Sequence, residues 1–234
     1  MKIVILQSNY IPWKGYFDII GSVDLFIFHD DLQYTKGDWR NRNKIKTPKG
    51  TEWITVPCGT NEHRLICDVE LSSADWQRRH WNLIRAHYAK AAYFKQYAPF
   101  FESLYLSQAW TNLSDMNQYI IKAISVELLG IKTQFDDSRA YGLKAAKGER
   151  VIELLKKIGA ETYLSGPSAK SYLAVSAFEK AGIRLEWMNY RDYTEYPQLH
   201  PPFEHAVSII DLIFNAGPDA PSFMLFKKKI AGWK

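Results

Sequence analysis

The chain opens with two short apolar runs, each bounded by polar residues. The runs are KIVIL over residues 2–6 and DLFIF over residues 24–28. Apolar runs of this length without alternation predict strands buried on both faces of a sheet. Between them, residues 15–20 are expected to form a short helix that ends at Gly21. This opening therefore predicts a right-handed βαβ unit with parallel strands.

In the last third of the chain, apolar segments of strand length alternate with segments of helical periodicity. Strands are expected at 132–135, 162–164 and 183–188, and helices at 150–158, 169–180 and 207–215. Such alternation predicts an α/β fold with a Rossmann-like parallel sheet. The residues after the last helix, 226–234, are expected to form a loosely attached arm.

The middle of the chain follows another pattern. Residues 32–70 hold a Pro-Lys-Gly turn at 48–50 and a short alternating segment, which predicts a small β-hairpin insertion beside the sheet. Residues 74–130 carry apolar positions at helical spacing, which predicts a helical insertion ending at Gly130. We find no internal repeat, so residues 1–234 are expected to form one α/β domain with these two insertions.

Composition refines this picture in three respects. The net charge of +5 suits an anionic ligand but falls short of the clustered basic face of a nucleic-acid-binding protein. Aromatic residues make up 15% of the chain, and many stand among charges and amides, as in the walls of a pocket for a base or sugar ring. We expect a cytoplasmic protein with no membrane insertion, because the chain shows no signal peptide, no membrane-spanning segment and only two cysteines.

Three polar stretches directly follow predicted strands, where ligands of parallel α/β sheets bind. In the first, a helix start favours an anion, Gly15 allows close approach to the backbone, and Lys14 supplies charge. A tight turn with a structural glycine is the alternative. The candidate binding residues of this stretch are Gln7, Asn9, Tyr10, Trp13, Lys14, Gly15 and Tyr16.

The second stretch begins with two adjacent carboxylates, Asp30 and Asp31, which are the candidate catalytic residues. They could hold Mg²⁺ with phosphates, or accept a proton from an amine. Arginine forks that follow suit phosphate or carboxylate. A solvated acidic turn before a basic edge is the alternative. The candidate binding residues here are Gln33, Tyr34, Arg40, Asn41 and Arg42.

The third stretch combines a small-residue turn with a predicted helix start and a lysine one turn in, as in a phosphate cradle. An ordinary capped helix start is the alternative. Its candidate binding residues are Ser165, Gly166, Lys170 and Tyr172. We expect Asn9, Asp31 and Ser165 to face one common hollow. No metal site is predicted, and His80 is expected to be a packing or surface residue.

These stretches together resemble the WbqC-like family of bacterial proteins. The resemblance lies in QSNYIPWKGY at 7–16, DDLQYTK at 30–36, WRNRNKIKTP at 39–48, and shorter matches near 163–173, 196–198 and 208–212. It implies a role in the biosynthesis of O-antigen and other surface polysaccharides. For some members it implies transfer of glycine or another aminoacyl group to an amino sugar.

A second resemblance concerns nucleotidyltransferases and related adenylate-forming enzymes of the HUP class. Residues 13–16 (WKGY) are similar to a degenerate HxGH signature, and residues 164–166 with Lys170 are similar to the second phosphate motif of these enzymes. Trp13 and Tyr16 replace the two histidines, which argues against nucleotidyl transfer as such.

Taken together, the sequence predicts a transferase or ligase that joins a small amino acid to a nucleotide-linked amino sugar. ATP with Mg²⁺, or an already activated donor, would supply the activation. Two alternatives stay open at this point. One is a non-catalytic protein that binds a nucleotide or sugar nucleotide, and the other is an RNA-binding protein that uses the basic stretch at 40–49.

Overall fold

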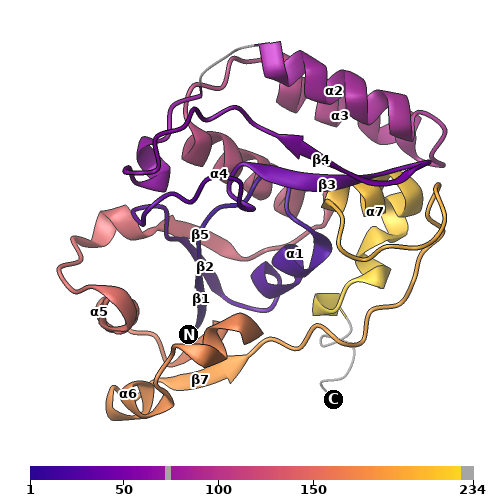
Figure 1. Cartoon of the computed structure of the whole chain (residues 1–234). Helices are drawn as coiled ribbons and strands as arrows, with labels where there is room; N and C mark the ends of the chain where they lie inside the picture. The colour runs from indigo at the N-terminus through magenta and orange to yellow at the C-terminus, as the bar shows by residue number, and fades with distance from the viewer. Residues whose placement is uncertain (72–74, 228–234) are drawn as a thin grey trace.

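The computed structural model describes residues 1–71 and 75–227. Five parallel strands form its central sheet in the order β5-β2-β1-β6-β7 (Figure 1). They are β1 (Lys2–Leu6), β2 (Leu25–Phe28), β5 (Gln134–Asp137), β6 (Thr162–Ser165) and β7 (Arg184–Trp187). The chain adds strands first on one side of β1 and then on the other, as doubly wound sheets do. The predicted α/β fold with a Rossmann-like parallel sheet is confirmed.

Helices cover the two faces of the sheet unequally. One face packs against α1 (Lys14–Ile20), α4 (Leu113–Ala123) and α7 (Ile209–Ala216), and the other packs against α5 (Lys147–Ile158) and α6 (Val175–Lys180). Alternate residues of β1 serve different cores, since Val4 joins the first and Ile3 and Ile5 join the second. Strands buried on both faces explain why their sequences are continuous apolar runs.

The residues between β2 and β5 form the two expected insertions. The antiparallel hairpin of β3 (Arg42–Thr47) and β4 (Gly50–Thr55) lies beside α2 (Asp75–Tyr88), which pairs with α3 (Phe94–Leu106). Ala74, where the helical insertion was expected to start, lies outside the described residues. Shorter helical turns complete the described chain at Ile66–Asp68, Ile124–Leu128, Ser138–Tyr141, Pro167–Ser171 and Gly217–Phe223.

The prediction of one helix over 169–180 is wrong. The structure has a 3₁₀ turn at Pro167–Ser171, an extended Ala174, and only then α6. Leu173 and Phe178 are both buried in the core beneath α5 and α6. Five residues apart on one continuous helix, they would point about 140° away from each other. The break at Ala174 lets both side chains reach the same core.

Strand β5 begins two residues later than predicted. The hydroxyl of Thr133 donates to the carbonyls of Ile20 (2.7 Å) and Val23 (3.0 Å), which holds the preceding segment against the turn after α1. Pairing with β2 therefore starts at Gln134, opposite Leu25.

The prediction of a loosely attached arm over residues 226–234 is wrong for its first residue, Phe226. Residues 228–234 lie outside the described part of the chain. Phe226 is buried, and a Cβ on Gly21 would meet its ring at 2.7 Å. The buried carboxylate of Asp18 accepts hydrogen bonds from the backbone N–H groups of Leu225 and Phe226. This attaches the end of the described chain to α1. None of the described helices combines the length and the apolar character needed to cross a membrane.

Candidate functional site

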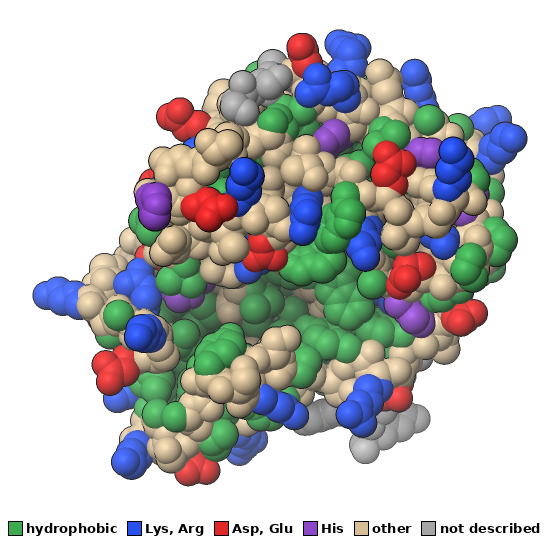
Figure 2. All heavy atoms as spheres, in the orientation of Figure 1, with side chains coloured by type: hydrophobic (Ala, Val, Ile, Leu, Met, Phe, Trp, Pro, Cys, Tyr) green, Lys and Arg blue, Asp and Glu red, His purple; other side chains and the backbone are tan. Residues whose placement is uncertain are grey.

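The carboxyl ends of β1, β2 and β6 meet at one edge of the sheet, beside the point where the strand order reverses between β1 and β6. This is the position at which open α/β sheets bind ligands. Figure 2 shows a hollow lined largely by hydrophobic side chains, between the part of the molecule that holds the β3–β4 hairpin and the part that holds β7 and α6. Lys and Arg side chains stand at several points of its margin.

Three cavities lie along this edge. The first, which we call the indole cavity, is lined by residues that include Asn9, Trp13 and Trp39 and has a volume of about 240 Å³. The second, the β1–α5 cavity, is lined by residues that include Gln7 and His29 and has a volume of about 500 Å³. The third, the β7 cavity, is formed by residues near Lys170 and Tyr190.

The side chain of Arg40 contacts one lining residue of each of the first two cavities. Its guanidinium donates one hydrogen bond to the side-chain oxygen of Asn9, which lines the indole cavity, and another to that of Gln7, which lines the β1–α5 cavity. The backbone of Gln7 is also held in place, because its main-chain carbonyl accepts a hydrogen bond from the hydroxyl of Tyr16 at 2.8 Å. The structure thus brings Gln7, Asn9, Tyr16 and Arg40 together, and it holds the positively charged guanidinium of Arg40 at the end of β1.

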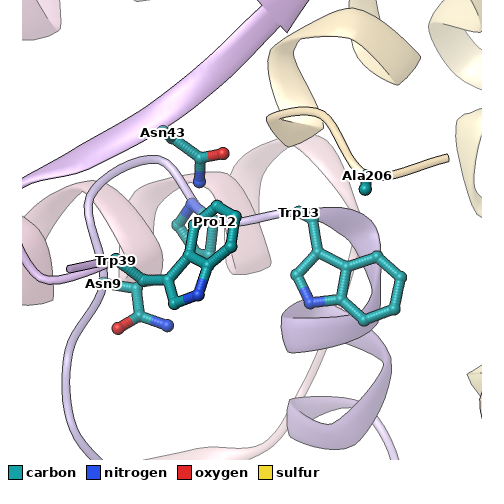
Figure 3. Close-up of a pocket in the computed structure, with 6 residues that line it drawn as sticks. All are labelled: Asn9, Pro12, Trp13, Trp39, Asn43 and Ala206. Carbon is teal, nitrogen blue, oxygen red and sulfur yellow. The ribbon is translucent and has the colours of Figure 1, made fainter. Parts of the chain in front are cut away.

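Trp13 forms a fixed wall of the indole cavity (Figure 3). Its indole packs against the rings of Tyr190 and Tyr193, with centroids at 5.3 and 5.9 Å. It also covers Gly15, where an added Cβ would lie 2.3 Å from the indole. The glycine therefore makes room for Trp13 in this structure, which differs from the expected approach of a ligand to the backbone.

Asp30 is completely buried at the end of β2, on the side of α4. One carboxylate oxygen accepts the backbone N–H of Ser8 at 2.7 Å, and the other accepts the hydroxyl of Ser114 at 2.5 Å and the amide of Gln118 at 3.2 Å. Three donors thus surround this carboxylate inside the protein. This geometry links the turn after β1 to α4.

Asp31 points to the other side of the sheet, toward α5. It forms an ion pair with Arg150 and accepts a hydrogen bond from the hydroxyl of Ser138 at 2.5 Å, and its side chain is 15% exposed. Arg150 also donates to Nε2 of His29 at 3.2 Å. Burial lowers the pKa of His29, and the nearby charge of Asp31 opposes that shift. His29 is therefore neutral at pH 7, beside the β1–α5 cavity.

Two residues of the first polar stretch lie in the interior. Tyr10 has no exposed surface, and its hydroxyl is hydrogen-bonded to Nδ1 of His80 (2.8 Å) and to the hydroxyl of Tyr105 (2.6 Å). Lys14 is 2% exposed, and its ammonium lies 4.4 Å from the ring centroid of Tyr193. Side chains of α2 and α3 enclose Tyr10, and the ring of Tyr193 lies against Lys14, so neither side chain lines any of the three cavities.

The candidate binding residues that follow β2 differ in their exposure and in their contacts. Gln33 is exposed, whereas Tyr34 is buried with the guanidinium of Arg64 near its ring. The buried side chain of Asn41 donates to the carbonyl of Val56. Arg42 stacks on Trp53 at 4.2 Å. In the same basic stretch, Lys46 is buried in the hairpin.

The third stretch contributes to the site in part. Ser165 is 2% exposed, whereas Tyr172 is 73% exposed and lines the β1–α5 cavity. Lys170 lines the β7 cavity and lies 5.5 Å from the ring of Trp187. Gly166 caps the 3₁₀ turn, so no α-helix begins there as the phosphate cradle required. Asn9 follows β1, Asp31 follows β2 and Ser165 ends β6, but Ser165 is buried and does not line the indole cavity with Asn9.

Sequence reasoning missed Arg150 and Lys147 in the first turn of α5. Lys147 lines the β1–α5 cavity and has a φ of +54°, an unusual backbone conformation for a residue with a side chain. The available signal was the position of Arg150 at the start of the helix predicted over 150–158. In residues 1–71 and 75–227, no group of three or more His, Cys, Asp or Glu side chains could hold a metal ion.

Comparison with known proteins agrees with this reading of the motifs. The uncharacterized protein Rv1507c of Mycobacterium tuberculosis is 44% identical over 227 residues, which cover 96% of this chain and 98% of that protein. No solved structure matches the chain. A profile of the WbqC-like protein family matches residues 7–223, which include the turn after β1, both aspartates and the α5 residues. The chain therefore belongs to the WbqC-like protein family.

Proposed function

We propose that this protein is a cytoplasmic aminoacyl transferase or ligase that joins glycine, or another small amino acid, to a nucleotide-linked amino sugar in the biosynthesis of bacterial surface polysaccharide such as O-antigen. The observation that carries the proposal is the row of cavities at the carboxyl edge of the sheet, with Arg40 held between two of them by Gln7 and Asn9. Aromatic walls and a fixed cation suit a ligand that combines rings with phosphates.

Arg40 is the group to which we assign the phosphates. Two of its N–H groups are fixed by neutral amide oxygens, so its positive charge is not neutralised by those contacts. Asp38 forms a long ion pair with it at 3.7 Å, which offsets part of this charge. Lys147 and Lys170 add positive charge along the same edge, from the β1–α5 and β7 cavities.

Asp31 is the group to which we assign the proton transfer. In the proposed step, the amine of the sugar attacks the carbonyl carbon of the activated amino acid and a C–N bond forms. The bond from that carbon to its leaving group breaks, and the nitrogen gives up a proton to the carboxylate of Asp31. Arg150 and Ser138 hold this carboxylate beside the β1–α5 cavity.

The two aspartates do not fit a magnesium site. Asp30 already accepts three hydrogen bonds in the interior, and Asp31 is paired with Arg150 on the other side of the sheet. A shared cation would need both carboxylates to face one point. The proposed reaction therefore uses no metal ion held between these two carboxylates. ATP would enter as a co-substrate that activates the amino acid, with its phosphates at the same cationic edge.

One observation favours a second candidate function, that of a non-catalytic sugar-nucleotide-binding protein. Both oxygens of Asp31 hold hydrogen bonds within the chain, so its contacts with Ser138 and Arg150 already occupy this carboxylate. A binding protein would use the same cavities without turnover.

The deciding experiment incubates the full chain with glycine, ATP and a set of nucleotide-linked amino sugars. A transferase or ligase is expected to add one aminoacyl group to the sugar, detected by mass spectrometry, with formation of AMP or ADP. Asp31→Asn should lower kcat by about 10²–10⁴-fold, the usual contribution of a general base, and leave ligand affinity close to that of the unmodified protein.

Asp136→Asn is the matched control, because Asp136 is a partly buried, hydrogen-bonded aspartate on the adjacent strand β5. Binding of a sugar nucleotide without any product across the set would contradict the enzyme and support the binding protein. Equal turnover in Asp31→Asn and the unmodified protein would remove Asp31 from the mechanism.

A further inference from the structure

We propose that the indole cavity binds the base of a nucleotide, in contact with the indoles of Trp13 and Trp39. This inference rests on the proposed function, because the base belongs to the nucleotide part of the proposed substrate. Figure 3 shows the indoles of Trp13 and Trp39 among the residues that line the cavity, together with Pro12 and Ala206. Aromatic side chains of this kind are suited to contact the flat ring of a base.

The size of the cavity fits one ring system. Its volume is about 240 Å³, and an apolar cavity of about 150 Å³ already accepts benzene. A base fits this space, whereas the ribose and the phosphates of the same nucleotide must lie outside it. Arg40 stands at the adjoining edge, since it holds the side chain of Asn9 that lines the cavity.

The chemistry of the walls favours a base over a sugar. The lining is mostly apolar, and its two amides differ in what they can offer. The amide nitrogen of Asn43 already donates to the carbonyls of Tyr10 and Ile11, both at 3.0 Å. The side-chain oxygen of Asn9 accepts from Arg40, which leaves its NH₂ group as the donor that this amide can offer a ligand. A pyranose with several hydroxyls would lose more hydrogen bonds in such a site than a base would.

The two walls are built for different tasks. Trp13 is packed on Gly15 and on Tyr190, so it is a preformed surface. Trp39 is 42% exposed and rests on Trp53, with ring centroids 5.1 Å apart. Its carbonyl accepts the backbone N–H of Tyr10 at 2.9 Å, which anchors this wall to the turn after β1. A base can therefore enter beside the exposed indole of Trp39, stack on it and reach the fixed indole of Trp13.

The test measures binding of UMP, AMP and ribose 5-phosphate to the full chain by titration calorimetry. At least one of the two nucleotides is expected to bind, and ribose 5-phosphate, which lacks the base, to bind at least ten-fold more weakly. Trp39→Ala should weaken nucleotide binding by about 5- to 150-fold, because stacking on one aromatic side chain is worth about 1–3 kcal/mol per base. Trp39→Phe should recover part of that loss.

Trp53→Ala is the matched control, because Trp53 is also about 40% exposed and touches Trp39 but does not line the cavity. It should change affinity far less than Trp39→Ala. A second variant, Ala206→Phe, fills the cavity from an exposed loop position without removing a wall, and should abolish nucleotide binding with the melting temperature retained. Saturation-transfer NMR should show the strongest contacts at the protons of the base.

Equal affinity for ribose 5-phosphate and the nucleotides, no binding of either nucleotide, or unchanged affinity in Trp39→Ala would overturn the inference. The outcome is separable from that of the proposed function. Base binding without aminoacyl transfer would leave the cavity assigned and the enzyme refuted. Aminoacyl transfer with an unaltered KM for the nucleotide sugar in Trp39→Ala would support the enzyme and refute the assignment of the cavity.

Discussion

The two faces of the central sheet differ in how completely they are closed. The face under α1, α4 and α7 is a continuous core, and Asp30 lies within it with no exposed surface. The face under α5 and α6 has a smaller core and borders the β1–α5 cavity of about 500 Å³. Asp31, which lies on this face, keeps 15% of its side chain exposed.

The difference shows how adjacent carboxylates can take separate tasks. Successive side chains of an extended chain point to opposite sides, so the residues after β2 are divided between the two faces. Asp30 turns to Ser114 and Gln118 of α4, and Asp31 turns to Arg150 of α5. In this pair, Asp30 is therefore a buried structural group, whereas Asp31 keeps part of its side chain exposed near the β1–α5 cavity.

The largest effect is expected from Asp30→Ala, which tests the closed face. The substitution leaves the backbone N–H of Ser8, the hydroxyl of Ser114 and the amide of Gln118 without their acceptor in a buried site. Each buried donor without an acceptor costs about 1–3 kcal/mol. Because three donors lose their acceptor, the free energy of unfolding should fall by at least about 3 kcal/mol, measured by urea denaturation.

Ser114→Ala is the control for that measurement. It removes one donor and leaves the carboxylate with two, so the loss should be about 1 kcal/mol. If Asp30→Ala unfolds at the same urea concentration as the unmodified protein, the proposed linking role of this carboxylate is wrong.

The second effect concerns a histidine of the closed face. Burial lowers the pKa of His80 from 6.5 to about 4. The folded chain therefore resists protonation while the unfolded chain takes up a proton below pH 6.5. Stability is fully present above pH 6.5 and is lost as the pH falls toward 4, by about 3 kcal/mol for this group. Denaturation curves across this range measure the slope.

His80→Gln should flatten that slope, because glutamine can hydrogen-bond to Tyr10 but does not titrate. The difference between the two curves isolates His80 from the carboxylates that also titrate at low pH. His29 on the open face offers the contrast, since the charge of Asp31 opposes the lowering of its pKa by burial. Identical pH profiles for His80→Gln and the unmodified protein would contradict the assignment.

The elements of the sheet could be predicted from the sequence because each is specified locally. The apolar runs at 2–6 and 24–28 and the glycines that end α1 and α5 depend on neighbours in the chain. The start of β5 depends instead on the hydroxyl of Thr133, which reaches back to the turn after α1. The break in the predicted helix at 169–180 depends on tertiary packing, because it lets Leu173 and Phe178 reach the same core.

The residues of the candidate site were predictable in kind but not in orientation. The polar stretches after β1 and β2 were found because ligands bind at carboxyl edges. The sequence could not show that Tyr10 turns inward to His80, or that Trp13 occupies the space above Gly15. Nor could it join Ala206 to Trp39 across more than 160 residues, because their proximity depends on the packing of the whole chain.

The smallest effect is expected from Asp31→Asn, measured as stability rather than turnover. Asparagine keeps an acceptor for Ser138 and removes only the charge that faces Arg150, whose side chain is 16% exposed. Arg150 retains acceptors at His29 and at the carbonyl of Leu143. Because this ion pair lies between the exposed and the buried case, and Arg150 keeps other acceptors, the free energy of unfolding should fall by about 1–2 kcal/mol. A loss as large as that of Asp30→Ala would mean that both carboxylates are structural, and the open face would then have no carboxylate left to act on a ligand.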